Sequence, residues 1–142
     1  MQKIIFEKII KADRNKVFDV TTNYENFQKL VPQYYPSIRI ISVRGNVSIV
    51  EEHLRIGGDE LVMLVKHVID TPVSHDIFVI GGDAKGTHIA KRYEFTPNGT
   101  KIIVEINWKQ RGLKKLVGIF SKNKILDEYG KILDEFAIIA EA

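Results

Sequence analysis

The sequence contains no cysteine. A disulfide framework, a thiolate metal site and a cysteine nucleophile are therefore excluded, and the absence fits a reducing compartment. Uninterrupted apolar runs approaching the roughly 20 residues that a membrane-spanning helix needs are also absent. The opening "MQKIIFEKII" has charges within its apolar run, which is not typical of a signal peptide. We therefore expect a cytoplasmic protein.

Several classes of function have little support in the sequence. The net charge is only +3 and no aromatic-basic RNA-binding motif accompanies it, so we expect no nucleic-acid partner. "GGDAKG" is not followed by a helix with Lys-Ser/Thr, so it is not a phosphate loop, and no serine lies in a G-x-S-x-G context. We expect neither a cofactor nor a metal, because no metal-binding spacing relates the four histidines, His53, His67, His75 and His88.

The first third of the sequence predicts one strand and two short helices. Residues 2–11 alternate as a strand, with Ile4, Phe6 and Ile10 on one face and Ile5 and Ile9 on the other. Asp13 is placed to cap a helix that runs to about Thr21, and Asn23 to cap a second helix. Pro32 cannot continue that second helix.

From residue 38 to 111 the pattern is one strand after another, and we count six. The breaks contain residues that tolerate turn conformations: "GN" at 45–46, "GGD" at 57–59, Pro72, "GGDAKGT" at 81–87 and "NGT" at 98–100. From Gly112 to the end the sequence predicts one long helix of about 30 residues. Its apolar stripe shifts phase slightly after Phe120.

These elements predict a single α+β domain over residues 1–142: a strongly bent, antiparallel seven-stranded sheet with two short helices after its first strand. The only element long enough to cover one face of the sheet is the C-terminal helix, which we expect to pack across it. The order and the words "VFDVTTNYENFQKLVP" and "RYEFTPNGTKIIVEINW" resemble the START-like (SRPBCC, birch-pollen-allergen-like) helix-grip superfamily. Within it, the sequence is most similar to the polyketide cyclase and coenzyme-Q-binding branch.

Two motifs carry this resemblance, which covers the whole chain. The first is a V-x-x-V helix followed by Y-x-x-F-x-x-(F/L)-x-P, matched by Val17, Val20, Tyr24, Phe27, Leu30 and Pro32. The second is an aromatic strand, Gly-Thr and an alternating strand, matched by Tyr93, Phe95, Gly99, Thr100 and residues 102–108. The resemblance implies a ligand cavity between the sheet and the long helix, but the motifs specify fold better than ligand.

Strand parity predicts which side chains face this cavity. With two-residue loops at "GN", "TP" and "NG", and a longer loop at "GGD", the facing pairs are Arg39–Glu52, Leu54–Met63, His67–Asp76, Val65–Phe78, Tyr93–Val104 and Lys91–Ile106. The inner face is then mostly apolar, with Arg39, Glu52, His67, Asp76 and Lys91 among its side chains. These ionisable groups either satisfy local structure or orient an apolar ligand, and we expect Lys91 to extend to the rim.

The candidate ligand-binding residues combine this face with a proline-framed turn, "PQYYPS". Its two tyrosines suit a boundary between apolar interior and water, although one ring could equally fill the core. The candidates are Tyr34, Tyr35, Met63, His67, Asp76, Phe78, Tyr93, Trp108 and Phe120. The resemblance further implies that the glycine loop gates the cavity, through Gly81, Gly82 and Gly86.

A basic cluster surrounds the predicted start of the long helix, where cations oppose the helix dipole. It comprises Lys109, Arg111, Lys114 and Lys115. The cluster is either a solvated helix start or a docking patch for an anionic membrane surface or head group.

The function that the resemblance implies is binding, or binding and transport, of a hydrophobic small molecule such as a lipid or an isoprenoid quinone. An aromatase/cyclase-type enzyme acting on a polyketide-like substrate is the first alternative, with His67, Asp76 or Tyr93 in acid-base roles. A protein-interaction or co-chaperone module is the second. The sequence names no protein partner.

Overall fold

The computed structural model describes residues 2–109 and 121–142, and in these ranges seven antiparallel strands form one sheet. Its order is β1-β7-β6-β5-β4-β3-β2, so all neighbouring strands are consecutive along the chain except β1 and β7. The strands are β1 (Gln2–Ile10), β2 (Ser37–Arg44), β3 (Val47–Ile56), β4 (Asp59–Asp70), β5 (Ser74–Gly82), β6 (His88–Thr96) and β7 (Gly99–Trp108).

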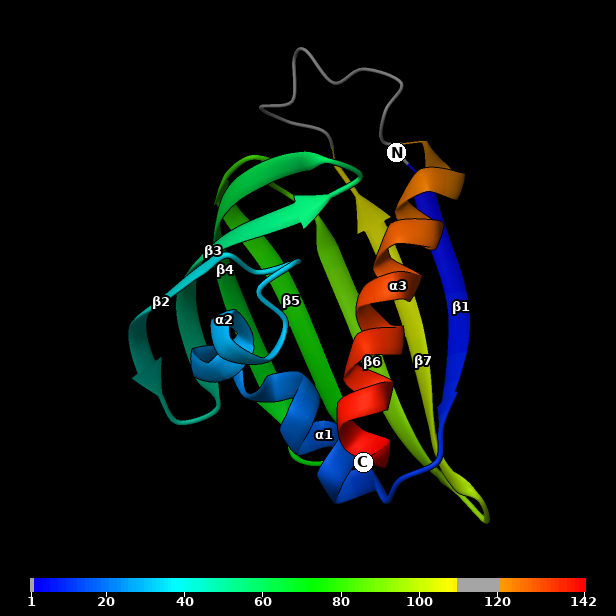
Figure 1. The fold of residues 1–142 in the computed structure, drawn as a ribbon. Coiled ribbons are helices and arrows are strands. Elements are labelled where there is room, and N and C mark those ends of the chain that lie inside the picture. The colour runs from blue at the N-terminus through cyan, green and yellow to red at the C-terminus, as the bar shows by residue number, and fades with distance from the viewer. Residues whose placement is uncertain (1, 110–120) are drawn as a thin grey trace.

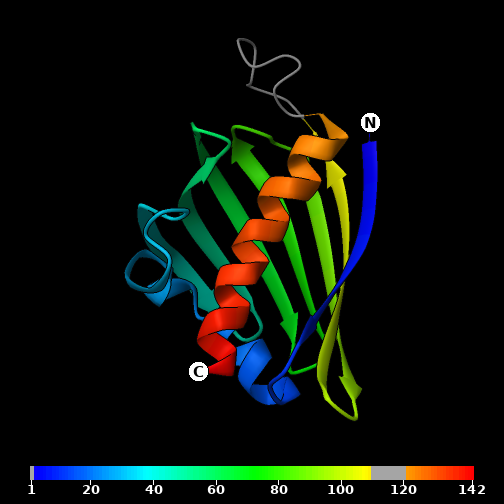
Figure 2. The same ribbon diagram turned by 45° about the vertical axis from the view of Figure 1, so that its right-hand side comes forward.

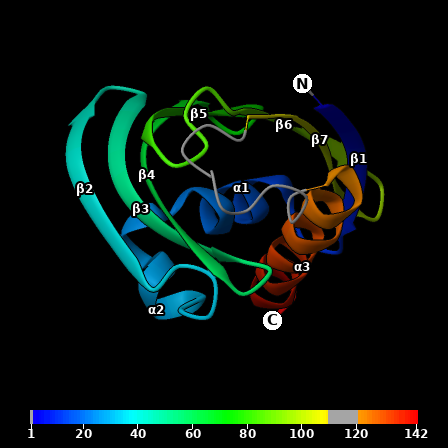
Figure 3. The ribbon, with the colours of Figure 1, turned by 90° about the horizontal axis from the view of Figure 1, so that it is seen from above.

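Helices cover one side of this sheet. They are α1 (Arg14–Thr22), the 3₁₀ turn η1 (Tyr24–Asn26), α2 (Phe27–Leu30) and α3 (Lys122–Glu141). Figure 1 shows α3 running diagonally across the sheet, and Figure 2 shows the same crossing from the side of β1. Seen from above, the sheet is an arc from β2 to β1, with α3 across its open side (Figure 3). The predicted α+β helix-grip fold is therefore confirmed.

The alternation predicted for the first strand is also confirmed. Ile4 and Ile10 are buried, whereas Ile5 and Ile9 are more than half exposed. On the inner side, Phe6 meets Tyr129 of α3 edge to face, with ring centroids 6.5 Å apart. Burial of this apolar face against α3 is what fixes the helix on the sheet.

Two predictions about helix ends are wrong and one is confirmed. Asp13 caps α1 as predicted, since its carboxylate accepts a hydrogen bond from the backbone N–H of Asn15. Asn23 makes no side-chain cap, because η1 intervenes before α2. The C-terminal helix does not run unbroken from Gly112: Ser121 is extended, and its hydroxyl caps α3 by accepting from the N–H of Lys124.

In two hairpins the predicted register is displaced by two residues. Leu54 pairs with Leu61 instead of Met63, and Tyr93 pairs with Ile102 instead of Val104. An even displacement keeps every side chain on its predicted face. The second displacement has a clear cause: Gly99 lies in β7 and not in the turn, and a Cβ there would stand 2.2 Å from the carbonyl oxygen of Ile10.

In the other two hairpins the error is one residue, which reverses the faces. Residues 71–73 form a three-residue connection, so His67 pairs with Ile77 and Asp76 points away from the interior. Between β2 and β3, the register shifts between Ile40 and Ser42, and Arg39 therefore pairs with Glu51 on the exposed side. The predicted pairs His67–Asp76, Val65–Phe78 and Arg39–Glu52 are wrong for this reason.

Candidate functional site

A cavity lies between the concave face of the sheet and α3. About 40 Å³ of it is open to the centres of water molecules, which is room for about three waters. Its lining is mainly apolar and comes from the central strands, α2 and α3; the aliphatic, methionine and aromatic members are Phe27, Tyr35, Leu54, Ile56, Met63, Val65, Ile77, Val79, Ile89, Ile106, Trp108, Ile125, Tyr129 and Phe136. An apolar lining with few polar groups is typical of small-molecule sites.

The polar lining is concentrated in an array that crosses three adjacent strands. Nε2 of His67 lies 2.5 Å from Oε2 of Glu52, and Nδ1 of His67 lies 2.8 Å from Nε2 of His75. All three side chains are buried, with exposed fractions of 4% or less. The hydroxyl of Tyr24 lies 3.4 Å from Nε2 of His75, and its ring stacks on His67 at 4.0 Å. We name Glu52, His67 and His75 the acid–histidine array.

The array has a free end. An ionised carboxylate only accepts hydrogen bonds, so Nε2–H of His67 donates to Glu52. In the tautomer with the His67 proton on Nε2, the other ring nitrogen accepts from Nε2–H of His75. This assignment follows from the hydrogen-bond network. It leaves Nδ1 of His75 without a proton, so its lone pair is free to accept a hydrogen bond. That atom is buried and has no hydrogen-bond partner among the residues that the structure describes. Burial, followed by the nearby Lys91 and His67, holds the pKa of His75 well below its usual range.

Lys91 is the fourth ionisable residue of the cavity. It pairs directly with His75 across β5 and β6, so both side chains project from the same face. Its side chain lines the cavity and the residue is only 3% exposed, which contradicts the prediction that it extends to the rim. Burial lowers the pKa of Lys91 to about 8, although the Glu52 carboxylate opposes this effect.

Hydroxyl groups complete the lining. Tyr35 and Tyr129 contribute their rings, and burial raises the pKa of both phenols, so they stay neutral donors. Thr21 and Thr87 also line the cavity. The hydroxyl of Thr21 lies 2.6 Å from that of Tyr93, which ties α1 to β6 beneath the cavity.

The structure brings four of the predicted ligand-binding residues together. Tyr35, Met63, His67 and Trp108 all line the cavity. Tyr93 is buried but does not line it, and Tyr34 is partly buried against the core. Phe120 lies outside the described residues.

The remaining two candidates project from the other face of β5. Asp76 accepts a hydrogen bond from Nε2 of His88 at 2.8 Å, and Phe78 stacks on the His88 ring at 4.4 Å. This places Asp76, Phe78 and His88 in a half-exposed cluster outside the cavity.

Sequence reasoning found Glu52, His67 and Lys91 on the inner face but missed His75. The segment "SHDIFVI" is apolar on both faces, so alternation could not decide between His75 and Asp76. Only the length of the preceding turn separates the two choices.

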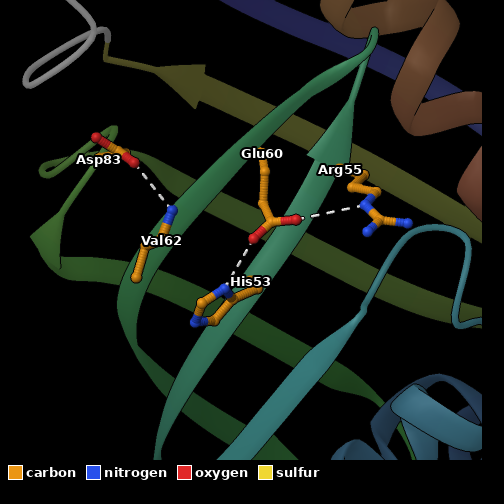
Figure 4. A network of polar contacts seen from close by, with 5 residues as sticks. All are labelled: His53, Arg55, Glu60, Val62 and Asp83. Atoms are coloured by element: carbon orange, nitrogen blue, oxygen red, sulfur yellow. Dashed lines mark hydrogen bonds and ion pairs between the residues drawn. The ribbon is translucent and has the colours of Figure 1, made fainter.

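The predicted gate loop is shorter than expected, because Gly81 and Gly82 belong to β5 and pair with Leu64 and Met63. The loop that remains, residues 83–87, is held at both ends. The Asp83 carboxylate accepts from the N–H of Val62, as Figure 4 shows, and Thr87 exchanges hydrogen bonds with the backbone of Lys109. Gly86 lies between these contacts with φ +97. A gating role for this loop stays a prediction.

Figure 4 also shows that Glu60 joins the two strands of the β3–β4 hairpin. Its carboxylate lies 3.0 Å from Nδ1 of His53 and 3.3 Å from Nε of Arg55. These hydrogen bonds, the one from His53 above all, lower the pKa of Glu60. The cluster is exposed and stabilises the hairpin that carries Glu52 on its inner side.

The basic cluster is described only in part. Lys109 follows β7, whereas Arg111, Lys114 and Lys115 lie outside the described residues. Across residues 2–109 and 121–142, no three His, Asp or Glu side chains are grouped to hold a metal ion. In the same ranges, no helix has the length and apolar character to cross a membrane.

No family model and no curated protein matches the sequence. The structure, in contrast, is similar to solved structures over nearly its whole length. TTHA0849 from Thermus thermophilus matches with a TM-score of 0.77 and 16% identity, covering 99% of this chain and 100% of that one. The Zhui aromatase/cyclase from Streptomyces sp. R1128 matches with a TM-score of 0.77 and 12% identity, covering 99% and 93%.

A plant protein shows the same likeness. Ginseng major latex-like protein 151 from Panax ginseng has a TM-score of 0.77 and 14% identity, with coverage of 99% and 98%. The fold is that of the START-like, birch-pollen-allergen-like (SRPBCC) proteins. At these identities the likeness concerns the fold, so the function has to be argued from the cavity.

Proposed function

We propose that this START-like chain binds a hydrophobic small molecule, of the lipid or isoprenoid-quinone kind, and acts as its carrier. The observation that carries the proposal is the cavity itself: a mainly apolar lining under α3 that contains a small set of buried polar groups. A filled interior would instead favour a module that works only through its surface.

The size of the cavity sets a condition on binding. Because about 40 Å³ is open to water centres, a ligand larger than a few waters has to displace lining side chains. Met63 is suited to this, since an unbranched thioether side chain repacks easily.

The test uses Trp108, the only tryptophan, which lines the cavity. Titration with a short-chain ubiquinone and with decanoate should shift or quench its emission, and organic extraction after native mass spectrometry should identify any co-purified ligand. Val79→Phe should reduce binding because the side chain lines the cavity. Ile80→Phe, on the exposed face of the same strand, is the matched control. Unchanged emission with both ligands, and no extracted ligand, would refute the proposal.

The acid–histidine array favours a second candidate, an enzyme of the aromatase/cyclase kind. A carboxylate, two imidazoles and a free ring nitrogen facing a cavity are suited to moving a proton. The test is turnover of an aromatic polyketide-like substrate by wild type and by His75→Phe. Turnover that survives this substitution unchanged would refute a role for the array in such chemistry.

A further inference from the structure

The position of Lys91 is unusual for its residue type. Lysine is almost never fully buried unless its charge is paired. Here the Lys91 side chain projects into an apolar cavity. Its amine makes no hydrogen bond or ion pair with the residues that the structure describes. Glu52 acts on this amine only through longer-range electrostatic attraction. If Lys91 only stabilised the fold, we would expect its amine to have a hydrogen-bond or ion-pair partner.

His75 gives the amine a neighbour that can exchange protons. The two residues are directly opposed on the inner face, and Nδ1 of His75 is the unpartnered end of the acid–histidine array. A proton accepted at that nitrogen can pass through His75 to His67, where the positive charge lies beside the Glu52 carboxylate. The array is therefore suited to accepting a proton from the buried amine, to which it is not hydrogen-bonded.

We propose that Lys91 forms a reversible imine with the carbonyl carbon of an apolar aldehyde or ketone held in the cavity. The proposal rests on the proposed ligand-binding function and specifies the class of ligand. Lysine amines that are buried among apolar groups are the ones that proteins use for imine formation.

The atoms balance without a further reactant. The ammonium of Lys91 loses a proton to the array, and the neutral amine forms a C–N bond to the carbonyl carbon, giving a carbinolamine. The array returns the proton to the carbinolamine hydroxyl, the C–O bond breaks, and one water leaves. The products are the protonated imine, which carries the positive charge of the original ammonium, and water, with no change of oxidation state.

Charge favours a carbonyl compound over a carboxylate. Glu52 already places one negative charge among the cavity side chains and is close enough to affect Lys91. The Lys91 ammonium and the Glu52 carboxylate offset one another, so a carboxylate ligand would leave one negative charge in excess in this apolar space. A neutral carbonyl compound adds none.

The experiment is reductive trapping with hexanal and cyanoborohydride at pH 7, followed by intact mass and peptide mapping. Reduction of the imine adds the mass of hexanal less one oxygen atom. Because burial lowers the pKa of Lys91 to about 8 from 10.5, its free-amine fraction is about 300-fold that of an ordinary lysine at this pH. The adduct should therefore form on Lys91 before it forms on exposed lysines such as Lys29.

Three variants and one unreactive probe separate the possible causes. Lys91→Arg keeps the charge and should remove the early adduct, whereas Lys29→Arg should not. His75→Phe should slow trapping at least about tenfold when wild type and variant are compared at equal occupancy, which titration with 1-hexanol, followed through Trp108, sets for each protein. Hexanol has the same apolar body but no carbonyl, so it reports on the cavity alone.

Adduct formation on Lys91 no faster than on Lys29 in the wild-type protein, with hexanol still bound, would overturn the imine and leave the proposed function standing. No Trp108 response to either compound, together with no early adduct, would overturn both. Equal trapping rates in wild type and His75→Phe would overturn the role of His75 in the step.

Discussion

Replacing Lys91 by methionine should make the protein more stable at neutral pH. Methionine has a similar length and no charge, so the variant removes the cost of burying an ammonium in an apolar cavity. The folded-state pKa of Lys91 is about 8, compared with 10.5 for an ordinary lysine. At about 1.4 kcal/mol per pKa unit, this shift corresponds to about 3 kcal/mol of lost stability when the amine is charged in both states.

The sign of the pH dependence follows from proton counting. Between pH 8 and 10.5 the unfolded chain holds a proton on Lys91 that the folded protein has released, so wild-type stability rises with pH in this window. The advantage of Lys91→Met should therefore be largest below pH 8 and shrink by about 3 kcal/mol by pH 10.5.

The assay is urea unfolding of wild type and variant across this range, and only the difference between the two curves is used. Buried tyrosines with raised pKa values, Tyr93 and Tyr129 among them, destabilise both proteins at high pH and cancel in that difference. Lys29→Met, at an exposed position, should change stability by no more than about 0.5 kcal/mol. A Lys91→Met protein no more stable than wild type at pH 7, or with a gain that does not vary with pH, would show that the amine reaches water.

Three further experiments test buried contacts. A double-mutant cycle on Glu52→Ala and His67→Ala should give a coupling energy of about 1–3 kcal/mol, because each removal leaves the other group buried without its 2.5 Å partner; a coupling near zero in urea unfolding would contradict the pair. Tyr93→Phe should destabilise the protein by about 1–2 kcal/mol through loss of the hydrogen bond to Thr21, whereas Tyr34→Phe should have little effect on the melting temperature, and equal effects would contradict this. Gly82→Ala should lower the melting temperature far more than Gly45→Ala: both have positive φ, but a Cβ at Gly82 would stand 2.3 Å from the carbonyl oxygen of Val62 and one at Gly45 meets nothing.

Much of the fold was determined by the sequence alone. Alternation in the first strand, the Asp13 cap and the order of elements were sufficient to predict the sheet, its seven strands and the helix across it. Local patterns carry this information because burial of one face imposes a period of two on a strand and about 3.6 on a helix. The same reasoning placed Glu52, His67 and Trp108 inside, since a register error of two residues keeps each side chain on its face.

The composition of the site was decided by the tertiary structure. His75 enters the cavity and Asp76 leaves it because the turn before them has three residues and not two, and both faces of β5 are apolar enough to accept either choice. Lys91 stays inside because neighbouring strands and helices enclose it, and its stem therefore cannot carry the amine to water. A one-residue difference in turn length and the enclosure of a side chain depend on how distant elements pack, which no local sequence pattern encodes.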